Sequence, residues 1–105
     1  MAKLIGLNKE EVMDHGLTTL SNTTPVRLTP NGKHSGIDIT LQNVNDTGYI
    51  YIGGSDTVSS TNYGFRIMPN HSISIELNGN DAIYAISSAN GMSLAVLKAR
   101  LEVGS

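Results

Sequence analysis

The stretch that decides the fold runs from Tyr49 to Leu77 and reads YIYIGGSDTVSSTNYGFRIMPNHSISIEL. It opens with four strand-forming residues, 49–52, and breaks at Gly53-Gly54. A polar loop, 55–63, follows and carries a single charged residue. The last run, 72–77, places isoleucine and leucine at every second position, with serine and glutamate between them. This alternation is typical of a half-buried antiparallel strand, so the stretch predicts a β-structure.

The same pattern extends in both directions from this stretch. Residues 37–42 alternate apolar and polar side chains, and so do seven residues of the last run, 93–103. In 82–87, Ile83 and Ala85 alternate against Tyr84 and Ile86. Clusters of Asn, Gly and Pro separate these runs, among them the turn-forming segment 43–48. The spacing predicts an all-β fold, an antiparallel sandwich of about seven strands with jelly-roll or Greek-key topology. In the last run Leu97, Ala99, Leu101 and Val103 share one face. The residue types of this run also permit a helix, but the alternation and the lack of an N-cap with an acidic first turn favour a strand.

The first 24 residues show weaker patterning, which divides the chain into an N-terminal arm, 1–24, and a sandwich domain, 25–105. Asn8 can cap a short helix over 9–15. The arm is open to two interpretations: a loosely packed terminal segment, or a segment that becomes ordered on a neighbouring subunit. In the second case its partner-binding anchors are the apolar residues Leu4, Ile5, Leu7, Val12, Met13, Leu17 and Leu20.

Composition narrows the range of functions. The chain has 105 residues, a formal net charge of −2 and no cysteine. Its seven Lys and Arg residues are scattered, which argues against binding nucleic acid through phosphate contacts. We expect no signal peptide and no membrane span, because no apolar run approaches the roughly 20 residues that a span needs.

Catalytic patterns are missing from the sequence. His15, His34 and His71 lack the spacing of metal ligands, and each is expected on the surface. Ser55 and Asp56 follow Gly54 without the nucleophile-elbow motif, so both are read as turn formers. We therefore expect no catalytic residue, no cofactor and no metal, and predict that the chain is not an enzyme.

The aromatic residues are the most informative surface candidates. Tyr49 and Tyr51 fall on one face of their run, opposite two isoleucines expected in the core. Together with Tyr63 and Phe65 they form a possible interface, because tyrosine buries much area at low entropic cost. Packing within the chain, under the 55–63 loop, and stacking against a sugar remain open as alternatives.

One resemblance rests on the order of these motifs: aromatic-Ile-Gly-Gly-Ser-Asp, a Ser/Thr/Asn loop, Gly-aromatic-x-Ile, a proline turn, Ser-Ile-x-Ile-x-Leu and Ala-Ile-Tyr-Ala-Ile-Ser. In this order the segment from Asn43 to Val103 resembles small β-sandwich virion proteins of tailed bacteriophages. The motifs are structural rather than catalytic. A turn glycine that is usual in the pattern is replaced by Asn70.

The resemblance implies a non-enzymatic virion structural protein, assembled in the host cytoplasm. Its partners would be the major capsid protein or other virion proteins. The first expectation is a capsid decoration (cement) protein that docks on coat subunits through its arm and self-associates, with a trimer favoured. The alternative is a tail, neck or fibre protein that attaches to the host or binds glycan through Tyr49, Tyr51 and the 55–63 loop.

Overall fold

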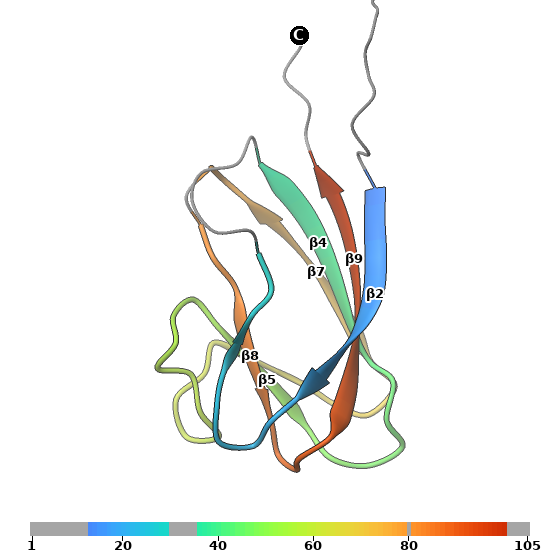
Figure 1. The fold of residues 1–105 in the computed structure, drawn as a ribbon, viewed down its shortest axis with the longest axis vertical. Coiled ribbons are helices and arrows are strands. Elements are labelled where there is room, and N and C mark those ends of the chain that lie inside the picture. The colour runs from blue at the N-terminus through green and yellow to red at the C-terminus, as the bar shows by residue number, and fades with distance from the viewer. Residues whose placement is uncertain (1–12, 30–35, 80, 101–105) are drawn as a thin grey trace, which may run out of the picture.

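Two antiparallel four-stranded sheets pack face to face in the computed structural model, which describes residues 13–29, 36–79 and 81–100 (Figure 1). The first sheet has the order β2 (Met13–Leu20), β9 (Met92–Arg100), β4 (Ile37–Asn43) and β7 (Ser72–Leu77). The second has the order β3 (Val26–Arg27), β8 (Tyr84–Ser87), β5 (Ile50–Gly53) and β6 (Phe65–Ile67). The all-β class is confirmed, with eight strands rather than about seven in this part of the chain.

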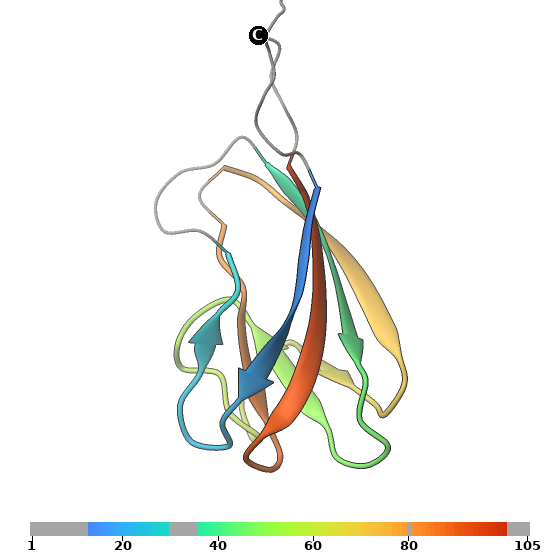
Figure 2. The same ribbon diagram turned by 45° about the vertical axis from the view of Figure 1, so that its right-hand side comes forward.

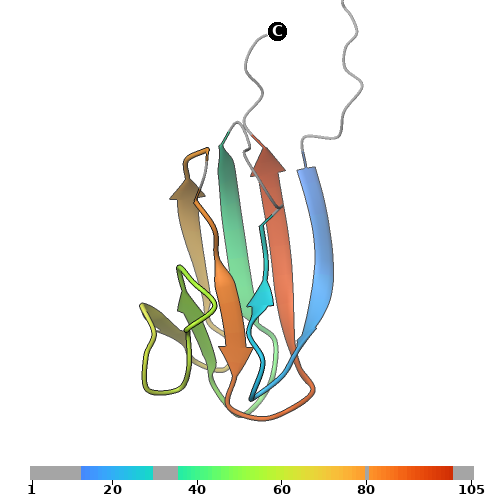
Figure 3. The same cartoon turned by 60° about the vertical axis from the view of Figure 1, so that its left-hand side comes forward.

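The core lies between the sheets and is built by the alternating residues. Ile37, Ile39 and Leu41 of β4 are fully buried, and they face Ile50 and Ile52 of β5. Each strand therefore turns one face to the core and the other outward, as the period of two requires. The faces expected for 37–42 and 49–52 are confirmed. Figure 3 shows the second sheet in front of the first.

The described part of the expected arm is a strand of the sandwich. Met13–Leu20 pairs with β9 residue by residue, from Met13 opposite Ala99 to Leu20 opposite Met92 (Figure 2). Residues 13–15 are thus extended, which corrects the short helix expected over 9–15, and the sandwich begins before residue 25. The tertiary pairing outweighs the local helix signal, because two helical turns are only marginally stable alone. Residues 1–12 lie outside the described residues.

Strand β9 confirms a strand over the last alternating run as far as residue 100. Its buried face carries Met92, Leu94 and Val96, whereas Leu97 is 40% exposed. Lys98 lies on the inward side and its Nζ donates a hydrogen bond to the carbonyl oxygen of Leu28 at 3.4 Å. The apolar pair Leu97 and Ala99 therefore lies on the outer face of the sheet. Leu101 and Val103 lie outside the described residues.

Asn70 adopts the left-handed backbone conformation, with φ of 64°. Among the described residues it is the one non-glycine with a positive φ. Asparagine tolerates this region better than most residues, so it can stand where a turn would otherwise use glycine. In the same described ranges, no helix is long and apolar enough to cross a membrane.

Candidate interaction surfaces

An apolar stripe runs along the outer face of the first sheet, over β2 and β9. Its exposed members are Met13 and Leu17, which are 52% and 71% exposed, and Leu97. The register places Leu17 opposite Ala95, and His15 opposite Leu97. Ala99 lies opposite Met13. We define the β2–β9 stripe as the apolar residues on this face of the two strands: Met13, Leu17, Ala95, Leu97 and Ala99.

A shallow groove of about 540 Å³ lies within the stripe. Its apolar lining includes Leu17, Ala95 and Leu97. Its polar rim comes from His15 of β2 and from Thr40 and Gln42 of β4. Solvated apolar side chains in a contiguous group mark interaction sites more often than single exposed residues do. The groove therefore offers a place where a partner's apolar side chains can be buried.

The other half of this face is polar. On β7 and β4, Glu76 lies directly opposite Asp38, and Ser74 lies opposite Thr40. The two hydroxyl oxygens of Thr40 and Ser74 are 2.8 Å apart and share a hydrogen bond. The outer face thus changes from apolar at β2 to acidic and hydroxylated at β7.

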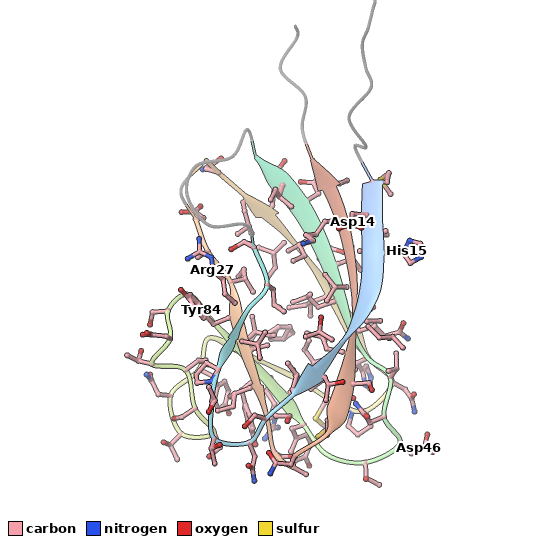
Figure 4. All side chains as sticks on the ribbon, in the orientation of Figure 1. Asp14, His15, Arg27, Asp46 and Tyr84 are labelled. Atoms are coloured by element: carbon pink, nitrogen blue, oxygen red, sulfur yellow. The ribbon has the colours of Figure 1, made fainter. Side chains whose placement is uncertain are left out.

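A second hollow of about 220 Å³ lies where the edges of the two sheets approach, between β2 and β3. Asp14 and Thr18 line it from β2, Arg27 and Leu28 from the β3 segment, and Lys98 from β9. His15 projects away from β2, while Arg27 lies beside Tyr84 across the molecule (Figure 4). The hollow carries charges of both signs, so it does not favour a purely anionic or a purely cationic ligand.

The tyrosines gather on the outer face of the second sheet, and all but Tyr63 are buried or partly buried. Tyr51 is only 8% exposed, because Val58 of the long loop packs over it and over Ile86. The ring centroids of Tyr51 and Tyr63 are 4.9 Å apart at a tilt of 42°. Packing under the 55–63 loop thus accounts for Tyr51, and Tyr49 is partly buried in the same cluster.

Two arginines flank this aromatic cluster. The Arg66 guanidinium carbon lies 4.7 Å from the ring centroid of Tyr49, and that of Arg27 lies 5.8 Å from the centroid of Tyr84. Arg27 also donates from a terminal nitrogen to the Tyr84 hydroxyl at 3.2 Å. These cation–π contacts hold the tyrosines against the sheet. Tyr63 and Phe65 remain exposed at its margin.

The long loop encloses a polar hollow of about 290 Å³ beside Tyr63. Ser55, Thr57 and Asn62 contribute its polar groups. The loop is held closed by Asn62, whose Nδ2 donates to the carbonyl oxygen of Thr57 at 3.1 Å. The hollow thus places an exposed aromatic ring next to hydroxyl and amide groups.

The expected anchor residues divide between core and surface. Leu20 is buried in the core, whereas Met13 and Leu17 belong to the β2–β9 stripe. Leu4, Ile5, Leu7 and Val12 lie outside the described residues. The sequence had placed Leu97 and Ala99 on one face of their strand, but nothing in the alternation says that this face points outward. Only the pairing with β2 reveals that they extend the stripe.

Within residues 13–29, 36–79 and 81–100, no group of three or more His, Cys, Asp or Glu residues could hold a metal ion. Comparisons of the chain with protein-family models, with curated proteins and with solved structures found no match.

Proposed function

We propose that the chain is a non-enzymatic structural protein of a bacteriophage virion, a decoration protein that docks on coat subunits through its N-terminal segment. The observation that carries this proposal is the way in which the strands nest. Pairing joins β2 with β9, β3 with β8, β4 with β7, and β5 with β6. The first described strand thus pairs with the last, the second with the seventh, and so on inward.

This nesting supports a jelly-roll topology, which a long antiparallel ribbon forms when it rolls up into two sheets. Two further pairs, β4 with β9 and β5 with β8, close the sheets after rolling. Jelly rolls of eight strands are frequent in viral capsid proteins and in lectins. The topology therefore agrees with the resemblance of residues 43–103 to phage virion proteins. It is also consistent with a lectin-like role.

The β2–β9 stripe supports docking at this end of the chain. It begins at Met13, the first residue that the structure describes. Covering an exposed leucine such as Leu17 contributes about 1.5–3 kcal/mol from apolar burial. A coat subunit that covered the groove beside Leu17 and Leu97 would gain this energy and would lie next to the N-terminal segment.

The test is the loading of purified protein onto particles that lack it. Deletion of residues 1–12 removes no described strand, whereas deletion through Leu20 would remove β2 and uncover the edge of β9. We expect the 1–12 deletion to keep its far-UV circular dichroism spectrum and to lose loading. Full loading of this truncated protein would overturn docking through the N-terminal segment.

A substitution in the stripe separates docking from folding. Leu17→Asp places a charge in the groove, and Ser72→Asp places the same charge on the outer face of β7 as the matched control. We expect the first variant to load poorly and the second to load normally, with unchanged spectra for both. Equal loading of the two variants would contradict a contact at the stripe.

A second candidate, a glycan-binding module of a tail or fibre, is favoured by the hollow beside Tyr63. Because Tyr51 is buried, replacing it would disturb the fold rather than a binding surface. Tyr63→Ala is the sharper test, with Phe65→Ala as a control that removes another exposed ring. Glycan-array binding that is lost in the first variant and kept in the second would support this function, and no binding by the native chain would eliminate it.

A further inference from the structure

Four strands form the edges of the two sheets, and β2 is the least protected of them. β3 has two residues and β6 has three, so each offers little backbone for pairing. β7 has six residues and presents Ser72, Ser74 and Glu76 outward. β2 has eight residues, contains neither lysine nor proline, and exposes Met13 and Leu17. Natural edge strands usually avoid this combination, because it promotes pairing with another strand.

The backbone of β2 has one side available for such pairing. All eight residues pair with β9, and no strand in the described part of the chain lies on the other side. β2 forms the margin of the molecule in Figure 3. At its centre, a Cβ added to Gly16 would meet no atom within 4 Å, so no side chain crowds the middle of the strand. Outward N–H and C=O groups form a ready template for another strand.

We infer that β2 of one copy pairs antiparallel with β2 of a second copy, which joins two first sheets into one eight-stranded sheet. This inference stands on the edge geometry and does not rest on the proposed function. An edge strand that pairs with its own copy in this way generates a two-fold axis and hence a dimer. The dimer replaces the trimer that the resemblance favours.

The sequence of β2 is complementary to itself in this arrangement. Opposite residues of an antiparallel pair project to the same face, so odd-numbered positions must oppose odd-numbered positions. With Gly16 opposite Gly16 of the second copy, Asp14 lies opposite Thr18, whose hydroxyl can donate to the carboxylate. His15 then lies opposite Leu17, and no charge opposes a like charge.

The same register brings the exposed apolar side chains together. Leu17 becomes the diagonal neighbour of Met13 and of Leu17 in the second copy, a distance that long side chains can bridge. The β2–β9 stripes of the two copies therefore join across the axis. This apolar continuity favours a second copy over a partner strand of unrelated sequence.

The interface is small. Pairing through one strand buries less than the roughly 1,600 Å² of a standard interface, so the dimer should dissociate on dilution. Sedimentation velocity of the full chain over a concentration series measures this directly and needs no virion component. We expect a reversible monomer–dimer equilibrium for the native chain.

Lysine substitutions test whether β2 is the contact. Leu17→Lys brings two ammonium groups to diagonal positions across the axis and should weaken association at least tenfold. Ser72→Lys puts the same charge on the other edge of the sheet and should leave the equilibrium unchanged. Both sites are exposed, so both variants should stay folded.

Disulfide trapping can identify the register of the two β2 strands. The chain has no cysteine of its own, so only the introduced cysteine can crosslink. We would introduce one cysteine at a time as His15→Cys, Gly16→Cys or Leu17→Cys, with Ser72→Cys as the control. Oxidation should give a covalent dimer most readily with Gly16→Cys and none with the control. A dimer at His15→Cys or Leu17→Cys instead would support the same edge pairing in a shifted register. A chain that stays monomeric at every concentration, forms a trimer, or dimerises without crosslinking at any of the three positions would overturn the inference.

Discussion

At the scale of single residues, the buried amide of Asn43 connects three segments of the chain. Asn43 is 0% exposed, and its Nδ2 donates to the carbonyl oxygens of Gly48 and Ile67 at 3.1 and 3.0 Å. Its Oδ1 accepts from the backbone and the side chain of Asn45 at 3.1 and 2.7 Å. Every polar group of the side chain is thus satisfied, which is the condition for keeping an amide in a core.

Asn43→Ala should therefore lower the free energy of unfolding by about 2–3 kcal/mol, since it leaves buried carbonyl groups without donors. The exposed neighbour Gln42 provides the matched control, and Gln42→Ala should change stability by less than about 0.5 kcal/mol. Urea denaturation of both variants measures the difference. Equal midpoints would show that the Asn43 network contributes nothing to stability.

Gly53 makes room for the loop that covers Tyr51. A Cβ at this position would lie 2.9 Å from Cγ2 of Val58, whereas one at Gly54 would meet nothing within 4 Å. Gly53→Ala should cost about 1–3 kcal/mol from overpacking, and Gly54→Ala should not. In the double variant Gly53→Ala/Val58→Ala the two effects should be less than additive, because the second substitution removes Cγ2, the closest atom, and leaves only the Cβ contact at 3.0 Å. Additive losses in thermal denaturation would contradict this contact.

At the scale of elements, substitutions in β2 test whether the core of the sandwich holds this N-terminal strand. Leu20 is 2% exposed in the core, whereas Leu17 lies outward. Leu20→Ala should cost about 2–5 kcal/mol, as large-to-small core substitutions do, and Leu17→Ala should cost about 0.5 kcal/mol or less. Chemical denaturation distinguishes the two. A small effect at both positions would mean that β2 is not held by the core.

The sequence predicted strands best where apolar side chains face the core. In β4 and β5 the buried positions are isoleucine and leucine, so alternation revealed both the strand and its inner face. In β2 the pattern is reversed, because Met13 and Leu17 point outward while the inner positions include Asp14 and Gly16. This segment is held extended only by its pairing with β9, which lies about 79 residues further along the chain. Local patterns carry no information about such a partner.

The sequence predicted the candidate surfaces only in part, for the same reason. Tyr49 and Tyr51 were correctly placed opposite the core isoleucines, but alternation could not show that Val58 covers Tyr51. Met13 and Leu17 are predicted as contact residues because they are apolar residues of the expected arm, but the structure exposes them for a different reason. They lie on the outer face of an edge strand, which depends on sheet order rather than on local sequence.

At the scale of the whole molecule, one core connects the two sheets. The main apolar cluster includes Leu20, Leu41 and Leu94 from the first sheet and Ile50 and Ala85 from the second. Neither sheet can bury its inner face without the other, so unfolding should be a single cooperative transition.

The tyrosines make this cooperativity measurable. All four lie on β5, on β8 or in the segments next to β5 and β6, so tyrosine fluorescence reports on the second sheet alone, whereas far-UV circular dichroism reports on both. The two urea denaturation curves should superimpose. A fluorescence transition at lower urea would show that the second sheet unfolds by itself.

The proposed role in a bacteriophage virion is tested most directly by measuring the amount of this chain in purified particles of a phage that carries its gene. Quantitative mass spectrometry would express its copy number relative to the major capsid protein. A decoration protein predicts a number comparable to that of the coat subunits. A few copies per particle would move the chain to the neck, tail or fibre, and its absence from the particle would contradict the account.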